Sequence, residues 1–540
     1  MVNKIIGFTI SKNDINHDDI DVFQVNLKQI KFKHAGLNIY LWGIQDFELC
    51  RINNSYSLSF PLSNNLLDRN LLITLDDNLV IIENDWLGSI PVFYNEKNLI
   101  VSTLSLKTLT DPEIYHEGFI NYIQFGYSVL ENTPFLCTKF LRYYSKLIIS
   151  SKEMNVFYKH DPICMEGVFD KTTNEGEVFL KIHSYISEIE DRTSDEIIIP
   201  SSGGYDSRLL NLCINDKNRI RAFTYGISDD QSKSSEVVFA KRITDILNIN
   251  WSQIELGKYN NYIDDWFKIF GFSTHLHGMY HIEFYKKILE SHSFRKDATF
   301  LSGIIGDAWA GNVIIDPISN INELINLGHS HGIHGDISEL LIKSNNINLN
   351  NYLIKNVTLL INPKIRIISS MRMKILLLSY LTIIPEYFGF PVWTPFLNFK
   401  IAIGMLNLPK DRRDQRVWQK EIFKKNGLDV ESLGLKPDFS NTQDYHAFYK
   451  HEFEPLDIDI LHNYFRKDYL IKVNTLMEHK DKKIMQDSLR LKIFIKLPFI
   501  ERILIKYDIT KEANKDILIA VPYYILKPIE KSIKFLKNLH

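Results

Sequence analysis

The sequence predicts a mainly β domain followed by a doubly wound α/β domain with a parallel sheet, and then a helical part. Residues 1–165 consist of short runs of Ile, Leu, Phe, Tyr and Val separated by clusters of Asn, Asp and Ser, as in strands joined by turns. From residue 177 helical and strand patterns alternate, which indicates parallel strands joined by helices. After about residue 311 the pattern is mostly helical.

Strands of the first domain are expected at residues 5–10, 37–42, 71–75 and 79–82. Residues 85–94 read as a turn into a further strand, and residues 99–103 as the return strand of a hairpin. A polar segment, residues 167–176, contains turn formers and few apolar residues. We therefore expect three parts, at residues 1–165, 176–435 and 436–540.

The second domain begins with a helical period from residue 177, and its further elements follow in alternation. Strands are expected at 197–200, 220–225, 251–256 and 299–302, with helices from 207 and at 235–247 between them. In a parallel sheet of this kind ligands bind at the carboxyl ends of the strands.

Composition excludes several classes of protein. The 540 residues are 45% hydrophobic and 24% charged, and 63 Lys and Arg nearly balance 65 Asp and Glu. This balance gives no basic field, so a dedicated nucleic-acid binder is disfavoured. The cysteines are far apart and form no CxxC pair, which excludes disulfide scaffolds and Cys-rich zinc modules: Cys50, Cys137, Cys164 and Cys213.

The expected location is cytoplasmic. The longest apolar stretch, residues 375–385, is about half of the roughly 20 residues that a membrane span needs, and the polar start lacks a signal-peptide pattern. The segment from residue 490 contains 11 Lys and Arg against 5 Asp and Glu. A helical face packed on its own domain is the favoured interpretation, and contact with an anionic membrane or an acidic partner is the alternative.

A Gly-rich turn after the strand at 197–200 has the properties of a phosphate-binding loop. In residues 202–207 (SGGYDS), two glycines let the backbone approach an anion, and two serine hydroxyls and a helix N-terminus can bind it. No Lys follows the glycines, so this is not the GxxxxGK(S/T) loop, and Asp206 instead offers an oxygen ligand to Mg²⁺. The alternative is a plain Gly-Gly turn and helix cap.

Several motifs together resemble the asparagine synthetase family of pyrophosphate-loop ATP enzymes. The SGGxDS loop is the first, and residues 301–311 (LSGIIGDAWAG) resemble the family's LSGxGxDExxxG. Residues 395–398 (PFLN) resemble its PFLD, and residues 418–424 (WQKEIFK) resemble the stretch with its conserved lysine. In the first domain the DxxGxxPLYY segment of the family's glutaminase is matched by Asp85, Gly88, Pro91 and Tyr94.

The resemblance implies a fold, cofactors and site residues. The first domain would be a glutaminase-like domain of the N-terminal-nucleophile type, and the second would bind ATP and Mg²⁺. Pyrophosphate would be held by Ser202, Gly203, Gly204 and Ser207, and Mg²⁺ by Asp206 and Asp307. The rest of the ATP site would comprise Ser201, Tyr225, Ser302 and Gly303. Asp206 and Lys420 would be the catalytic residues, Lys420 by neutralising phosphate charge. The alternatives are a helix N-cap for Asp307 and a solvated side chain for Lys420.

Departures from the family pattern affect the nitrogen source and the acceptor. Residue 2 is Val2, where the family exposes a nucleophilic Cys, and the first cysteine is Cys50. In the second domain Ile304 and Ala308 replace Glu, Ile305 replaces Gly, and Asn398 replaces Asp. ATP binding is compatible with these changes, but the acceptor is expected to differ from aspartate.

Two groups of histidines lie near the predicted site. The first is His275, His277 and His281, whose i, i+4 pair shares a helix face, and the second is His329, His331 and His334 in a Gly-rich loop. Either group could bind zinc. Otherwise the first group could line an acceptor pocket or simply pack in the core, and the second could lie in a loop over the active site.

The function expected from these motifs is that of an ATP-dependent, AMP-forming amide synthetase. It would adenylate a small-molecule or sugar-linked carboxylate, such as a uronic acid of a bacterial surface polysaccharide, and transfer it to ammonia or an amine. The alternatives are an intramolecular cyclase resembling β-lactam synthetase or the lasso peptide cyclases, and a non-catalytic nucleotide-binding protein. No nucleic-acid partner and no membrane association are expected, and a homodimer is compatible with the sequence.

Overall fold

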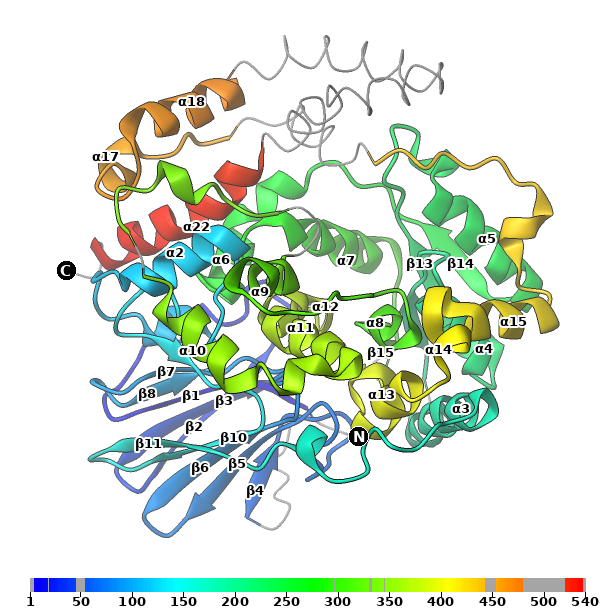
Figure 1. Cartoon of the computed structure of the whole chain (residues 1–540), viewed down its shortest axis with the longest axis horizontal. Helices are drawn as coiled ribbons and strands as arrows, with labels where there is room; N and C mark the ends of the chain where they lie inside the picture. The colour runs from blue at the N-terminus through cyan, green and yellow to red at the C-terminus, as the bar shows by residue number, and fades with distance from the viewer. Residues whose placement is uncertain are drawn as a thin grey trace.

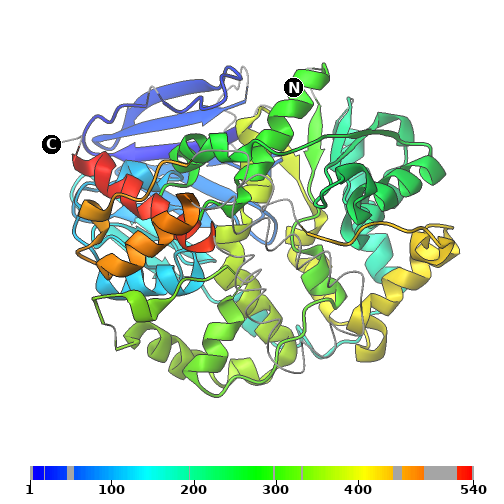
Figure 2. The ribbon, with the colours of Figure 1, turned by 90° about the horizontal axis from the view of Figure 1, so that it is seen from above.

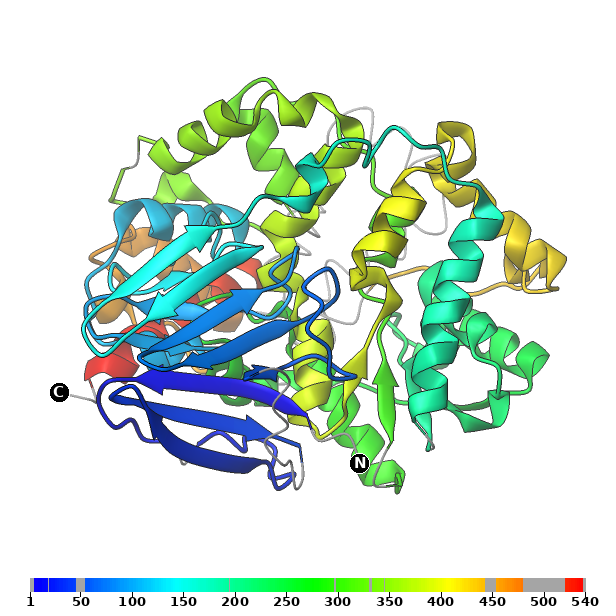
Figure 3. The ribbon, with the colours of Figure 1, turned by 90° about the horizontal axis from the view of Figure 1, so that it is seen from below.

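The computed structural model describes residues 4–17, 19–44, 54–193, 195–295, 298–329, 333–343, 345–441, 453–478 and 520–537. In this part of the chain two antiparallel sheets lie on one side of the molecule and a parallel sheet lies on the other (Figures 1 and 3). The protein is therefore a mixed α/β structure, as the sequence predicts.

The first antiparallel sheet has the strand order β2-β3-β1-β8-β7-β9. Its strands are β1 (Ile5–Ser11), β2 (Lys28–His34), β3 (Leu37–Gly43), β7 (Phe93–Asn95), β8 (Ile100–Ser102) and β9 (Lys139–Phe140). The predicted hairpin is confirmed, because β7 pairs antiparallel with β8 and Phe93 lies opposite Ser102.

The second antiparallel sheet has the order β11-β10-β6-β5-β4. Its strands are β4 (Ser55–Ser57), β5 (Leu71–Asp76), β6 (Leu79–Asn84), β10 (Ser145–Ile149) and β11 (Met154–Tyr158). The two sheets share one apolar core, in which Phe8 and Ile39 of one sheet and Ile73, Ile82 and Leu147 of the other are fully buried. Between β8 and β9 the chain forms α1 (Ser105–Thr108) and α2 (His116–Phe125).

Helix α3 (Glu175–Arg192) begins at the end of the predicted linker. The side chain of Asn174 accepts a hydrogen bond from the Glu177 backbone N–H at 2.8 Å, which caps the helix. The polar segment thus lies between the β-rich part and the second domain, and its Asn174 caps the first helix of that domain.

The parallel sheet has the order β14-β13-β12-β15-β16. Its strands are β12 (Ile197–Pro200), β13 (Ile220–Thr224), β14 (Asn250–Gln253), β15 (Thr299–Leu301) and β16 (Val392–Trp393). Every pair is parallel, and helices such as α4 (Tyr205–Cys213), α5 (Ser235–Leu247) and α7 (Tyr280–Ser291) join the strands. The predicted parallel sheet is confirmed, and β16, only two residues long, is an edge strand that the sequence did not predict.

The chain after residue 305 is mostly helical where it is described. Its longer helices are α9 (Ile321–Gly328), α10 (Ile347–Asn356), α11 (Pro363–Leu378), α12 (Tyr380–Tyr387), α13 (Phe399–Leu406), α15 (Val417–Lys425), α18 (Lys467–Glu478) and α22 (Ala520–Lys537). In the described residues one segment, Pro363–Tyr387, is long and apolar enough to cross a membrane, but 72% of its apolar window is buried inside the protein. This burial is the behaviour of a core helix.

Helix α22 belongs to the basic C-terminal segment and is mostly buried. Tyr523, Ile525 and Ile529 lie in the same core cluster as Leu461 and Leu470. In Figures 1 and 2 α22 lies beside α18 and the short helix α17 (Ile458–Leu461). Helix α22 therefore packs on its own domain. Residues 490–519 of the basic segment lie outside the described part of the chain.

A buried ion network joins the β-rich part to the helical layer. Glu386 of α12 accepts two hydrogen bonds from Arg69, at 2.9 and 3.0 Å, and a third from Lys4 next to β1. The three side chains are 5% exposed or less. Because Glu386 faces two cations, its charge is fully compensated in a place that water does not reach.

Replacing Glu386 by Gln should lower the free energy of unfolding by about 3–5 kcal/mol, because two buried cations then lose their counter-charge. Urea denaturation followed by circular dichroism measures this loss. Glu188→Gln is the control, since Glu188 pairs with Arg192 at the exposed surface and should change stability by less than about 1 kcal/mol. A loss below about 1 kcal/mol for Glu386→Gln would contradict the role of the network.

Candidate functional site

The candidate site is a cavity of about 690 Å³ at the carboxyl ends of β12, β13 and β15. Parallel sheets bind ligands at this edge because the loops after the strands converge there. Of the residues that the resemblance implies for ATP and Mg²⁺, the structure places eight in the cavity wall: Ser201, Ser202, Asp206, Ser207, Tyr225, Ser302, Gly303 and Asp307.

The loop after β12 depends on Gly203. Its φ is +71°, and a Cβ at this position would lie 2.6 Å from Cβ of Phe239, so no other residue fits. Arg208 holds the loop from below, donating to the Gly203 carbonyl at 2.8 Å and to both oxygens of Glu431 at 2.7 and 2.9 Å. The loop is therefore held by contacts within the protein itself.

The N-terminus of α4 faces the cavity without a side-chain cap. Gly204 is the N-cap residue, and its backbone N–H donates to Ser202 Oγ at 3.3 Å. The hydroxyl of Ser207 donates to the Gly204 carbonyl at 3.2 Å. A helix start with backbone N–H groups and two hydroxyls is suited to an anion.

Asp206 and Asp307 meet at this end of the cavity. Asp206 Oδ2 accepts from the Asp307 backbone N–H at 2.8 Å, while Oδ1 is buried and has no hydrogen-bond partner. Burial first, and then the charge of Asp307, raises the pKa of Asp206 to about 8. Asp307 Oδ2 accepts from Asn312 at 3.0 Å. An unpartnered carboxylate oxygen beside a second carboxylate is the arrangement that Mg²⁺ with phosphates would satisfy.

Two further glycines allow this close approach. A Cβ at Gly306 would lie 2.9 Å from Cγ of Asp206 and 2.8 Å from the Phe396 ring, and a Cβ at Gly303 would lie 3.3 Å from Cβ of Asp206. The residues present therefore fit a Mg²⁺ bound jointly with a polyphosphate.

Ile305, which stands where the family has Gly, keeps the left-handed backbone that a glycine adopts. Its φ is +53°, a rare conformation for a β-branched residue. Such strain persists only where the surroundings enforce it, and it is common at functional sites. Ile304 and Ile305 are buried and form an apolar wall of the cavity.

Lys420 and Lys374 differ in whether they line the cavity. Lys420 on α15 is exposed and does not line the cavity. Lys374 on α11 does line it, and burial lowers its pKa to about 8, opposed by the charge of Asp307. The sequence contains one signal for Lys374, a single lysine followed by an apolar run at residues 375–378.

Two residues beside Lys420 act on Asp206 instead. The charge of Arg416 lowers the pKa of Asp206, against the effect of burial, and so does the nearby amide of Gln419, although this amide forms no hydrogen bond of regular geometry. The Arg416 guanidinium lies 4.4 Å from the centre of the Tyr205 ring in the phosphate loop. The segment that contains Lys420 thus acts on the site through Arg416 and Gln419, and not through Lys420 itself.

Aromatic residues form the other end of the cavity. Tyr225 lies edge-on to Phe284 with ring centres 5.1 Å apart, and His281 lies between Tyr280 and Tyr285. Burial lowers the pKa of His281 to about 3, so this imidazole is neutral at physiological pH.

The histidine groups are only partly brought to the cavity. His277, His281 and His329 line it. His275 is buried elsewhere, and its Nδ1 accepts from the His277 backbone N–H at 3.2 Å, while His331 lies outside the described residues. Among the residues that the structure describes, no three His, Cys, Asp or Glu side chains are grouped as metal ligands.

In the first part of the chain the DxxGxxP segment forms a buried turn. Asp85 accepts from the backbone N–H groups of Leu87, Ser89 and Asn70 at 2.9, 3.1 and 3.1 Å. Val2 and Cys50 lie outside the described residues. Burial raises the pKa of Cys213 to about 12, which makes this thiol a poor nucleophile.

No protein-family model and no curated protein matches this chain. Among solved structures, an NH3-dependent NAD synthetase from Campylobacter jejuni subsp. jejuni in complex with the nitrate ion matches with a TM-score of 0.19 and 19% identity. The match covers 34% of this chain and 74% of that protein. The resemblance to the asparagine synthetase family therefore rests on the sequence motifs alone.

Replacing His281 by Phe should make the protein more resistant to acid. The folded state keeps His281 neutral down to about pH 3, while the unfolded chain binds a proton below about pH 6.5, so this site loses stability as the pH falls from 6.5 toward 3. Relative to the wild type, the variant should gain about 1.4 kcal/mol for each pH unit below 6.5. Urea denaturation between pH 4.5 and 7.5 measures the gain.

The matched control is His183→Phe, at a half-buried position of α3. Equal pH profiles for His281→Phe and the wild type would show that His281 is protonated in the folded state.

Proposed function

We propose that this protein is an ATP-dependent, AMP-forming amide synthetase of the asparagine synthetase type. The observation that supports the proposal most is the unpartnered Asp206 Oδ1 beside Asp307, at the open N-terminus of α4 after a parallel strand. Two crowded carboxylates do not stabilise a turn. They would bind Mg²⁺, and the N-terminus of α4 would bind the pyrophosphate.

In this proposal the loop from Ser202 to Ser207 binds the pyrophosphate of ATP. Asp206 and Asp307 would hold Mg²⁺, which supplies positive charge that stabilises the leaving pyrophosphate. Ser201 and Tyr225, at the ends of β12 and β13, would line the adenosine. Because the Asp206 pKa is about 8 without a metal, metal binding has to displace a proton from this carboxyl at neutral pH.

The reaction consists of two transfers. An oxygen of the acceptor carboxylate attacks the α-phosphorus of ATP, pyrophosphate leaves, and an acyl adenylate forms. Ammonia or an amine then attacks the acyl carbon, AMP leaves, and the nitrogen loses a proton as the amide forms. In this proposal Lys374, which lines the same cavity, would stabilise the negative charge on the phosphates during the first transfer.

A nucleotide-binding protein without turnover is the second candidate. The observation that favours it is the exposed position of Lys420, the lysine to which the resemblance assigns the catalytic charge. The two candidates differ in whether any cation acts on the transition state, which variants of Lys374 and Lys420 can decide.

The proposal predicts that Asp206→Asn abolishes pyrophosphate release from ATP and weakens Mg·ATP binding, because a charged Mg²⁺ ligand is removed. Thermal shift with Mg·ATP measures binding, since a ligand at 100 times its Kd stabilises the folded state by about 2.7 kcal/mol. Asp245→Asn, at an exposed position of α5, is the control. An equal thermal shift in Asp206→Asn and the wild type would overturn the assignment of the site.

Lys374→Met should lower turnover by about tenfold or more while changing ATP affinity less, because its charge acts mainly on the transition state. Lys420→Met should stay near the wild-type rate, since its side chain is exposed outside the cavity. Steady-state pyrophosphate release at saturating ATP compares the two variants. The reverse order would return the catalytic role to Lys420.

Aspartate should be a poor acceptor. The family's Glu is replaced by Ile304, and the buried wall of Ile304 and Ile305 lacks the carboxylate that would bind an amino acid's ammonium group at this position, at a cost of about 1–3 kcal/mol. Incubation with aspartate, ATP, Mg²⁺ and ammonium, followed by amino-acid analysis, should yield no asparagine above background. Efficient asparagine formation would restore aspartate as the acceptor.

A further inference from the structure

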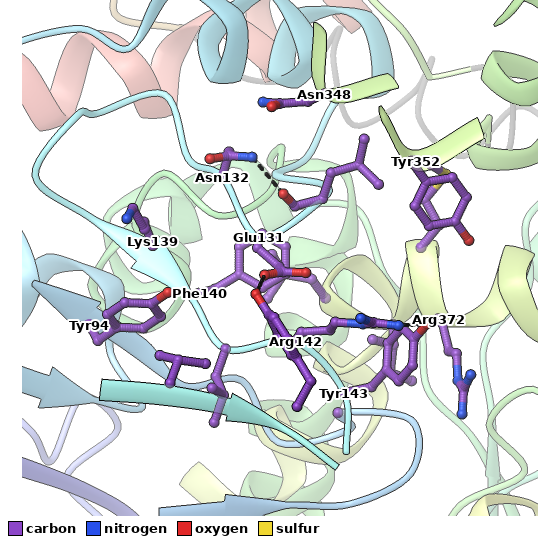
Figure 4. Close-up of a pocket in the computed structure, with 18 of the residues that line it drawn as sticks. Tyr94, Glu131, Asn132, Lys139, Phe140, Arg142, Tyr143, Asn348, Tyr352 and Arg372 are labelled. Atoms are coloured by element: carbon purple, nitrogen blue, oxygen red, sulfur yellow. Dashed lines mark hydrogen bonds between the residues drawn. The ribbon is translucent and has the colours of Figure 1, made fainter. Parts of the chain in front are cut away.

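A second cavity, of about 750 Å³, is lined by residues of α11 that do not face the nucleotide cavity, and Figure 4 shows part of its lining. Strands β7, β9 and β11 with the loop after β9 form one wall, and α10 and α11 form the other. Met371 and Lys374 of α11 line the nucleotide cavity, whereas Arg372 and Leu376 line this one. The two cavities are therefore distinct, and one helix separates them.

Arg142 is one of two cations of this cavity, with Lys355, that make no ion pair in the described part of the chain. In the described part of the chain no carboxylate oxygen lies within 4.0 Å of its guanidinium, although Arg372 is paired with Asp161 and Lys139 with Glu96. Its guanidinium lies 4.6 Å from the Tyr143 ring centre and 5.2 Å from that of Tyr158. It donates one hydrogen bond, to the Tyr143 hydroxyl at 2.8 Å.

This arrangement leaves most of the guanidinium available. Arginine has five N–H donors in a planar fork that matches a carboxylate, and stacking on tyrosine rings fixes the plane of the fork. In Figure 4 Arg142 lies at the centre of the cavity between Glu131 and Tyr143. The Arg142 guanidinium could therefore bind one anionic group of a ligand.

The other polar groups of the lining suit hydroxyl groups. Five asparagines line the cavity: Asn132, Asn155, Asn348, Asn351 and Asn356. An amide both donates and accepts, as a hydroxyl does. Three of the amides donate within the protein, to Leu130 O, Tyr115 Oη and Tyr352 O, which fixes their orientation and leaves an acceptor oxygen on each.

The carboxylates in the wall disfavour a multiply charged ligand more than a singly charged one. Glu96 and Glu131 both line the cavity, and a phosphate group would be repelled by them. Glu131 Oε2 accepts from the Tyr158 hydroxyl at 2.7 Å, and a ligand hydroxyl could donate to the remaining oxygen lone pairs.

The turn that places Glu131 is strained. Leu130 and Glu131 have φ values of +54° and +65°, a pair of left-handed residues in a turn closed by the Asn132 N–H to Val129 carbonyl bond of 3.1 Å. Asn and Gly normally occupy such positions, so the strain has to be compensated by the surrounding structure. Such strain is typical of turns whose side chains have a function, here Glu131.

We propose that this cavity binds a small hydroxylated carboxylic acid of the sugar-acid class. Its carboxylate binds the Arg142 guanidinium, its hydroxyls bond to the asparagine amides and Glu131, and its ring or chain packs on Tyr143 and Tyr158. The proposal does not depend on the ATP reaction, because no residue of the nucleotide site takes part in it.

Isothermal titration calorimetry of the full chain without nucleotide tests the proposal, with D-glucuronate and D-galacturonate as probes and D-galactose and inorganic phosphate as comparisons. At least one hexuronate should bind, and galactose and phosphate should bind at least tenfold more weakly. Arg142→Leu should weaken hexuronate binding by about tenfold or more, and Arg142→Lys, which retains the charge without the planar fork, should be intermediate. Circular dichroism checks that each variant is folded.

Lys152→Leu is the matched control, because it removes one positive charge from the exposed turn between β10 and β11. It should leave hexuronate affinity unchanged. Absence of hexuronate binding, equal binding by Arg142→Leu, or galactose or phosphate binding as tightly as the hexuronates would each overturn the proposal. Because no ATP is present, these outcomes do not bear on the proposed amide synthetase.

Discussion

The candidate site depends on one electrostatic constraint, the crowding of Asp206 and Asp307 at the end of a parallel sheet. The Asp206 carboxyl is shielded from water and has one oxygen without a partner, and its pKa is therefore raised to about 8. Gly306 allows the close approach to Asp206, and Ile305 beside it has a left-handed backbone. Strain and an unsatisfied polar group in one place are more easily explained by a ligand than by folding alone.

Helix α11 connects the two halves of the molecule. Its period of 3.6 residues directs Met371, Lys374 and Leu378 to the nucleotide cavity, and Arg372 and Leu376 to the second cavity. Arg372 also binds Asp161 and the Trp86 carbonyl, so the helix is fixed to the β-rich part. Its apolar composition reflects burial between two layers, which is why it resembles a membrane span by composition.

The sequence predicted much of the fold, because the strands around 5–10, 71–82 and 197–200 have strong local patterns. It did not predict β16, since two residues give no period, or β2, whose exposed, lysine-rich sequence weakens the pattern. The loop residues were found through a local motif. Lys374 and Arg142 were not. The apolar run after Lys374 is a local signal, but it does not say which cavity the side chain enters, and both residues reach their cavities through contacts between distant segments.

A structure of the protein bound to Mg²⁺ and the non-hydrolysable α,β-methylene analogue of ATP tests the central claim most directly. We expect the β- and γ-phosphates to lie on the backbone N–H groups of residues 202–207 and one Mg²⁺ to be coordinated by Asp206 and Asp307. Phosphates bound elsewhere in the molecule, or a metal ion that neither carboxylate touches, would contradict it.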